Sequence, residues 1–140
     1  LHAYSNRIAR ELTGWKRGTA EAWDSMQVVA VECSESAAYM SNERHTGDEE
    51  TVRVVLDKGA LTSDLEVELV DAREDAQGRL RFVAKTALTL VERNGSREVY
   101  ELRFKQARPG HYKRALRILP SHPELPHRMD FALVRWVALQ

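Results

Sequence analysis

The sequence has few of the features that mark extracellular, membrane or nucleic-acid-binding proteins. It holds one cysteine, Cys33, in 140 residues, which excludes an internal disulfide and favours a reducing compartment. Lysine plus arginine and aspartate plus glutamate both number 21, so no net charge attracts nucleic acid or an anionic membrane. No apolar run approaches the roughly 20 residues that span a bilayer, and no signal-peptide layout is present. These absences predict a cytoplasmic protein that binds neither nucleic acid nor membrane.

The length of 140 residues is enough for one domain with its own hydrophobic core. The chain begins at Leu1, inside an amphipathic pattern, rather than at methionine, which predicts a segment of a longer protein. Apolar residues at steps of three and four predict a leading helix within residues 1–25, with a break or bend near Gly18. Residues 26–140 are expected to form the main domain. The helix face carries Leu1, Tyr4, Ile8, Leu12, Trp15 and Trp23.

Beyond residue 26 the apolar period changes to two, as in strands with one buried face. The pair Asn94-Gly95 predicts a tight hairpin between 80–91 and 98–106, because both residues accept positive φ. The predicted fold is mainly β: a seven-stranded antiparallel sandwich of the immunoglobulin or fibronectin-III type, preceded by the amphipathic helix. The expected strands are 27–33, 51–56, 65–72, 80–91, 98–106, 112–119 and 131–137.

The segment 109–120, PGHYKRALRILP, has the densest group of cationic side chains in these strands. In a sandwich, Pro109 and Gly110 would form a tight corner, and the Tyr112 hydroxyl would hydrogen-bond back across it. Strand alternation places Arg114 on the inner face, and its guanidinium is expected to extend from the sheet edge into water. We interpret the segment as a structural corner rather than a binding site.

Alternation within the strands also assigns faces to the charged residues. Glu66 and Glu68 are expected on the solvent face of strand 65–72, because they alternate with leucine and valine. Lys113 and Arg117 are expected on the face of strand 112–119 that points away from the core.

No catalytic or metal-binding constellation is predicted. His122 and His127 lie close enough in sequence for zinc, but prolines stiffen the segment between them and no further ligand pair has metal spacing. Cys33 lies among acidic neighbours, a poor setting for a reactive thiolate. Paired carboxylates such as Glu49-Glu50 are interpreted as solubilising charge, since a glycosidase needs two carboxyls across a cleft. A small enzyme or metal protein stays open as a minor alternative.

The three tryptophans are the strongest candidates for contacts. Trp15 and Trp23 share the helix face and are predicted to dock the helix onto the sandwich or onto another domain. Trp136, on the last expected strand, belongs either to the core or to the surface. An exposed Trp136 would offer a platform for sugar stacking, whereas interdomain or core packing is the favoured interpretation.

Three stretches of the chain resemble the C-terminal end of bacterial and archaeal α-glucan (glycogen or maltodextrin) phosphorylases. ARELTGWK at 9–16 with Ala22-Trp23 is similar to their "A-x-x-L-x-x-W-K … W" helix. GALTSDLEVELV at 59–70 is similar to "G-L-x-x-x-D-V-x-V-x-L", and 110–136 to "G-x-Y … R-V-x-P-x-H-P-x-L … L-V-x-W". The sequence departs from this pattern at Lys113-Arg114, where an apolar pair is usual.

The resemblance implies a noncatalytic β-sandwich domain with a structural or assembly role, packed against an upstream catalytic body of the same chain. The parent would be a glycosyltransferase that uses pyridoxal phosphate and phosphate to release glucose 1-phosphate from α-1,4-glucans. Because that family's cofactor lysine and phosphate-binding residues lie upstream, no catalytic, cofactor-binding or metal-binding residue is expected here. Homo-oligomer assembly is one of the implied roles, and a carbohydrate-binding module that recognises α-glucan is the alternative function.

Overall fold

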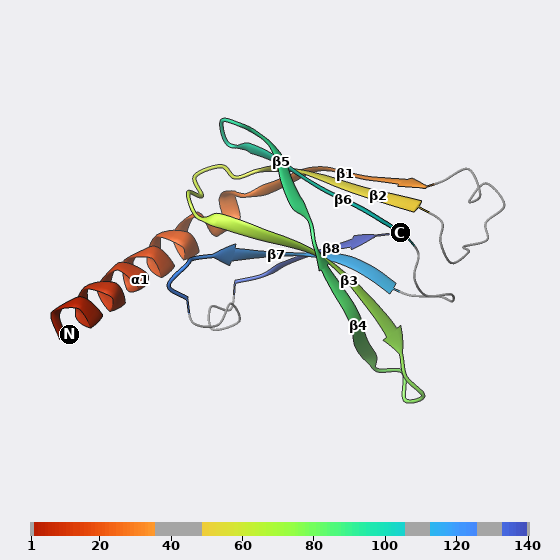
Figure 1. Cartoon of the computed structure of the whole chain (residues 1–140), viewed down its shortest axis with the longest axis horizontal. Helices are drawn as coiled ribbons and strands as arrows, with labels where there is room; N and C mark the ends of the chain where they lie inside the picture. Colours follow the sequence, from red (N-terminus) through yellow and green to blue (C-terminus); the bar gives the residue numbers. More distant parts are fainter. Residues whose placement is uncertain (1, 36–48, 106–112, 126–132, 140) are drawn as a thin grey trace.

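The protein is described by a computed structural model that covers residues 2–35, 49–105, 113–125 and 133–139 (Figure 1). Helix α1 (His2–Ala22) and the short 3-10 helix η1 (Trp23–Ser25) lead into two antiparallel sheets of four strands each. The predicted corner residues Pro109, Gly110 and Tyr112 lie outside the described residues, as do His127 and most of the acidic stretch 34–50.

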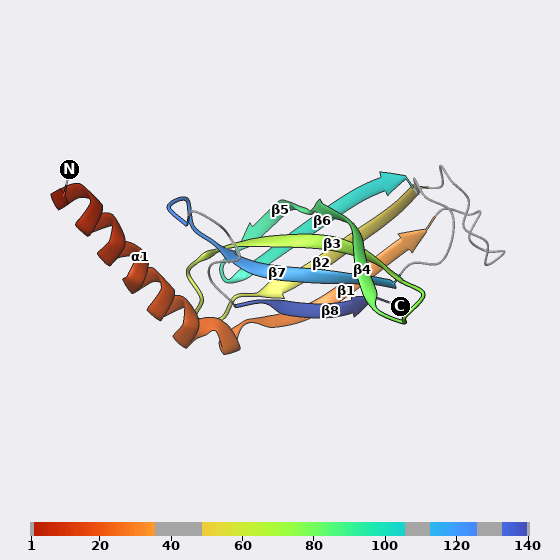
Figure 2. The ribbon, with the colours of Figure 1, turned by 90° about the horizontal axis from the view of Figure 1, so that it is seen from below.

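The two sheets face each other, as the views in Figures 1 and 2 show. Sheet A has the order β1 (Gln27–Glu35), β2 (Glu49–Asp57), β6 (Arg97–Lys105), β5 (Thr89–Asn94). Sheet B has the order β4 (Leu80–Ala87), β3 (Asp64–Glu74), β7 (Lys113–Ser121), β8 (Arg135–Leu139). The mainly β fold and the leading helix predicted from the sequence are therefore confirmed.

The core lies between the sheets because the strands bury every second residue. Strand β2 alternates buried and partly exposed positions along almost its whole length. The strands β3 and β7 supply the facing residues, and Trp23 and Met26 close one end of the core. The fully enclosed members, each at most 1% exposed, include Met26, Val54, Leu56, Val67, Leu116 and Ile118.

The described residues form eight strands rather than the seven predicted, because the expected strand 80–91 divides at Leu88. The Leu88 side chain is buried, and its backbone N–H donates to the Val67 carbonyl at 2.8 Å. At this point the chain passes from sheet B, where it forms β4, to sheet A, where it forms β5.

The predicted hairpin forms, but only the second half of 80–91 pairs with β6. Asn94 is opposite Arg97, so the two turn residues are Gly95 and Ser96 rather than Asn94 and Gly95. Gly95 adopts the positive φ of 61° that the turn requires. The turn is thus displaced by one residue from its predicted position.

Three exposed valines are explained by β-bulges on edge strands. Val29 in β1, Val83 in β4 and Val91 in β5 are each the extra residue where the pairing register shifts. All three are exposed. A bulge bends and twists an edge strand, which disfavours pairing with the edge of another chain.

Helix α1 runs unbroken through Gly14 and Gly18, so the predicted break near Gly18 is wrong. A Cβ at either glycine would have no neighbour within 4 Å, so neither glycine is needed to let the helix pack closely against the sheets. The N-terminal half of the helix extends away from the sandwich (Figures 1 and 2). Within the part of the chain that the structure describes, no helix is both long and apolar enough to span a membrane.

Candidate functional site

The outer face of sheet B holds a buried ion pair where the sequence predicts a solvent-exposed face. Glu68 of β3 and Arg117 of β7 are only 4% and 7% exposed. Arg117 donates two hydrogen bonds to Glu68 Oε1, from Nε at 3.1 Å and from Nη2 at 2.8 Å. The predicted exposure of Glu68 is wrong, because Glu68 is paired with Arg117, whose guanidinium is in turn covered by the Trp136 ring of β8. Buried charges are tolerated when they are paired and hydrogen-bonded in this way.

Trp136 lies directly over this ion pair. The Arg117 guanidinium carbon is 5.5 Å from the centroid of the Trp136 ring, within the range of a cation–π contact. The Trp136 and Phe82 rings are in contact, with centroids 5.8 Å apart and planes tilted by 38°. Trp136 is nevertheless 45% exposed and Phe82 63% exposed. We call these two residues the aromatic platform; the structure places Trp136 at the surface.

Phe82 reaches the platform because of the bulge at Val83. In the β3–β4 register, Lys85 is opposite Val70 and Phe82 is opposite Ala72, and the register shifts at Val83, the extra residue of the bulge. Without the extra residue, strand alternation would turn Phe82 to the opposite face of the sheet. Phe82 is not identifiable from the sequence, because the bulge depends on pairing with β3, which no local pattern in residues 80–91 reveals.

The other two tryptophans attach the helix to the sandwich. Trp23 is buried in the core cluster between the sheets. Trp15 is partly buried, and its ring centroid lies 4.9 Å from that of His122, just after β7. The hydroxyls of Thr19 and Ser63 are hydrogen-bonded to each other in a buried position. These contacts hold the C-terminal half of α1 against one end of the sheets.

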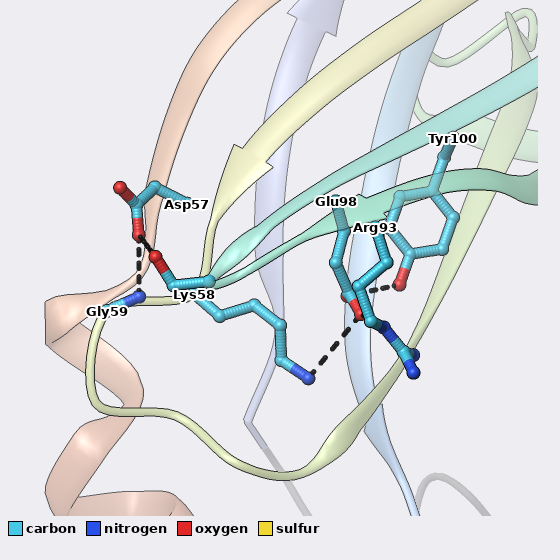
Figure 3. A network of polar contacts seen from close by, with 7 residues as sticks. Asp57, Lys58, Gly59, Arg93, Glu98 and Tyr100 are labelled. Atoms are coloured by element: carbon cyan, nitrogen blue, oxygen red, sulfur yellow. Dashed lines mark hydrogen bonds and ion pairs between the residues drawn. The ribbon is translucent and has the colours of Figure 1, made fainter.

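A second buried cluster centres on Glu98 of β6, which is 1% exposed (Figure 3). Its Oε1 accepts a hydrogen bond from the Tyr100 hydroxyl at 2.8 Å, and its Oε2 accepts one from Arg93 Nε at 2.8 Å. Lys58 Nζ lies 3.8 Å from Oε2. Burial, with the bond to Glu98, raises the pKa of Tyr100. The bond to Glu98 also raises the pKa of Arg93. The Arg93 guanidinium therefore keeps its charge and the Tyr100 phenol stays neutral.

A third cluster lies between the sheets at the end where β7 begins. The Arg114 guanidinium binds the Glu50 carboxylate of β2, and Arg114 Nε donates to Asp71 Oδ1 of β3 at 2.9 Å. Its carbon also lies 5.2 Å from the Phe104 ring centroid. Burial opposes the charge, but the carboxylates of Glu50 and Asp71 raise the pKa of Arg114. The inward direction predicted for Arg114 is confirmed, whereas its guanidinium binds two carboxylates rather than extending into water.

The metal alternative finds no support in the residues that the structure covers. No three histidine, cysteine, aspartate or glutamate side chains among them converge as a metal site would require. His122 Nδ1 accepts a hydrogen bond from the Glu124 backbone N–H at 3.0 Å, and its ring faces Trp15. Cys33, near the end of β1, is exposed.

Two aspartates in turns make the stability of the fold sensitive to acid. Asp57 accepts hydrogen bonds from the Gly59 backbone and the Ser96 hydroxyl, which lower its pKa. Asp75 accepts bonds from the Arg79 and Gln77 backbones, which with Arg81 lower its pKa. Because these carboxyls bind protons less readily in the folded chain than in the unfolded chain, the unfolded state is favoured as protons are added.

We expect the free energy of unfolding to be steady near neutral pH and to fall as the pH drops below about 4. Urea unfolding at a series of pH values measures this dependence. A variant carrying Asp57→Asn and Asp75→Asn should show a shallower decline in acid, because the two depressed carboxyls are gone. An equally steep decline in the variant would contradict the assignment to these two residues.

The comparisons with known proteins identify the family of the chain. Residues 23–138 match the family model described as the glycogen phosphorylase C-terminal domain. The match begins at Trp23, directly after α1, and ends within β8. A search of curated proteins found no match. The resemblance read from the sequence is thereby confirmed, and, since the match covers well over half of the 140 residues, the chain belongs to the glycogen phosphorylase C-terminal domain family.

Proposed function

We propose that this chain is a noncatalytic domain with a structural or assembly role in an α-glucan phosphorylase. The observation that carries the proposal is that the buried charged side chains are paired inside the fold. Each buried charged side chain of the described residues lies in an ion pair of the fold: Glu50, Lys58, Glu68, Glu98 and Arg117. A catalytic acid, base or nucleophile must instead reach a substrate. Enclosed pairs of this kind support a structural role.

The strand order supports an immunoglobulin-like arrangement of the sandwich. In that fold one sheet has the order A-B-E-D and the other contains C-F-G. Sheet A has the order β1-β2-β6-β5, and sheet B contains β3-β7-β8 with β4 beside β3. The first, second, sixth and fifth strands thus occupy the places of A, B, E and D. Folds of this type act as rigid modules whose functions reside in surface sites.

The parent enzyme is proposed to be a cytoplasmic glycosyltransferase that releases glucose 1-phosphate from α-1,4-glucans with pyridoxal phosphate. The described residues of this chain do not fit that cofactor. Their buried lysine, Lys58, points at Glu98, with Nζ 3.8 Å from Oε2, and is thus engaged in an ion pair of the fold (Figure 3). The cofactor is therefore assigned to an upstream catalytic body. Helix α1 precedes the family match, and residues 1–25 are proposed to connect the sandwich to that body.

The proposal is tested with the purified chain, glycogen, inorganic phosphate and added pyridoxal phosphate. We expect no glucose 1-phosphate above the level without protein. In the parent enzyme, removal of this domain should leave the rate per folded active site within about twofold while changing stability or assembly. Turnover by the chain itself, or loss of all activity in a parent that remains folded without the domain, would contradict the noncatalytic role.

A second candidate function is recognition of α-glucan. The exposure of Trp136, whose ring contacts both Arg117 and Phe82, favours it. The two functions are compatible, because the platform and the α1 contacts involve different residues of the domain.

A further inference from the structure

We propose that the aromatic platform of Phe82 and Trp136, on the outer face of sheet B, is a binding site for α-glucan chains. The pyranose rings of the glucan would stack on the exposed indole and phenyl rings. This proposal deepens the second candidate function and rests on it. The evidence is the way the rings are oriented, the surface around them and the size of the exposed area.

The orientation of Trp136 is fixed before any ligand arrives. The Arg117 guanidinium lies against the indole ring at 5.5 Å from its centroid. Arg117 cannot turn away easily, because it donates two hydrogen bonds to the buried Glu68 carboxylate. Phe82 contacts the same indole ring from β4. A side chain held in this way loses little conformational entropy on binding, which favours affinity.

Small side chains let the two rings meet across sheet B. Phe82 and Trp136 come from β4 and β8, the two edge strands, so their rings extend over β3 and β7 to lie in contact. In the pairing register, Ala72 is opposite Phe82, and Ala115 is opposite Ala138 in the row next to Arg117 and Trp136. Paired residues share a face of the sheet, and Ala72 is only 6% exposed, which agrees with rings that cover the central strands. Because Phe82 and Trp136 themselves stay exposed, a flat ligand can reach both rings.

Hydrogen-bonding groups border the aromatic platform. Lys113 lies in the same cross-strand row as Phe82 and Ala72, and its Nζ is 2.8 Å from Glu74 Oε1. Lys85 lies in the row of Val70 and Ala115. Lys85, Lys113 and Glu74 are all exposed. Ammonium donors and a carboxylate acceptor at the border of an apolar platform suit the hydroxyl groups at the edge of a sugar ring.

A sugar fits the platform better than a protein surface does. The face of an aromatic ring is negative, so it attracts the slightly positive C–H groups on the apolar face of a pyranose. A stable protein interface needs roughly 800 Å² from each partner, with 20–30 residues. Here the large exposed apolar side chains are the two rings and Leu80 beside Phe82 on β4, bordered by charged residues, and the exposed valines of β1, β4 and β5 are accounted for by bulges. Membership in a glycogen phosphorylase family selects α-glucan among the sugars.

The test is affinity electrophoresis of the whole chain in native gels that contain glycogen or amylopectin. We expect the wild-type chain to be retarded, and Trp136→Ala to weaken binding by at least about tenfold because the stacking surface is lost. Phe82→Ala should weaken binding by a smaller factor, and Trp136→Phe should retain part of it. Val91→Ala is the matched control, since Val91 is an exposed apolar residue on an edge of sheet A. It should bind like wild type.

The outcomes separate the two levels of the proposal. If the wild-type chain is not retarded, glucan recognition and this site both fail, whereas the noncatalytic structural role is untouched. If the chain is retarded and neither Trp136→Ala nor Phe82→Ala reduces the effect, glucan recognition stands and the platform is the wrong site. If Trp136→Ala removes a concentration-dependent dimer in sedimentation, and no retardation occurs, the platform is a protein interface and the proposal is overturned. Unchanged thermal midpoints exclude unfolding as the cause.

Discussion

Replacing Gly59 with alanine is expected to lower the free energy of unfolding by about 3 kcal/mol. Gly59 has a φ of +58°, a conformation that alanine adopts only at a cost. A Cβ at this position would lie 2.5 Å from the backbone oxygen of Ser25, at the end of η1. The loop 58–61 is also held against η1, because the Ala60 N–H donates to Ser25 Oγ at 3.0 Å. Substitution therefore strains the backbone and separates the helix from the sandwich.

Gly78→Ala is the matched control for this prediction. Gly78 has a similar positive φ of 76°, but a Cβ there would meet nothing within 4 Å. Its cost should be the conformational penalty alone, about 1 kcal/mol. Urea unfolding of both variants measures the difference. Equal losses for Gly59→Ala and Gly78→Ala would show that the contact with Ser25 contributes nothing.

Replacing Glu98 with glutamine is expected to cost about 3 kcal/mol, because the cations around it lose their buried counter-charge. Lys58 is buried and lies 3.8 Å from Glu98 Oε2. Glutamine also places an NH₂ group where the carboxylate accepts bonds from Tyr100 and Arg93. The thermal midpoint should fall by roughly 10 °C for a domain of this size.

Glu92→Gln supplies the comparison. Glu92 is exposed on β5, and its carboxylate lies 4.0 Å from an Arg53 nitrogen. Exposed pairs of this kind contribute about 0–1 kcal/mol, so Glu92→Gln should change stability by less than about 0.5 kcal/mol. Calorimetry or thermal melting followed by circular dichroism compares the stability lost by Glu98→Gln with that lost by Glu92→Gln. A loss at Glu98 no larger than at Glu92 would mean that the cluster in Figure 3 is not structural.

Much of the fold was predictable because its signals are local. Alternation marked strand 51–56 within β2 and 65–72 within β3, and glycine in Asn94-Gly95 marked the β5–β6 hairpin. The division of 80–91 into β4 and β5 was not predictable. Leu88 is not a turn-forming residue, and the chain around it stays apolar. Only its burial between the sheets and the hydrogen bond from its N–H to the Val67 carbonyl show that the chain passes from sheet B to sheet A here.

Of the two residues of the aromatic platform, only Trp136 could be predicted from the sequence. The residue type of Trp136 and its place on a late strand predict a contact residue. They do not determine whether its ring lies in the core or at the surface. Phe82 was missed because its direction depends on the bulge at Val83. Glu68 was assigned to solvent because its neighbours alternate, but its partner Arg117 is 49 residues away in sequence. No pattern within one strand reports a partner at that separation.

The amino-acid sequence by itself determined the leading helix, most of the strands, the presence of a glycine turn in the hairpin and the family. These features depend on the backbone preferences of single residues and on periodicity within one element. Only the tertiary structure decided where the charges of Glu68, Glu98 and Arg114 are placed and which aromatic rings meet over sheet B. The reason is physical: burial of a charge or a ring depends on side chains from distant strands, whose register and bulges exist only once the sheets have assembled.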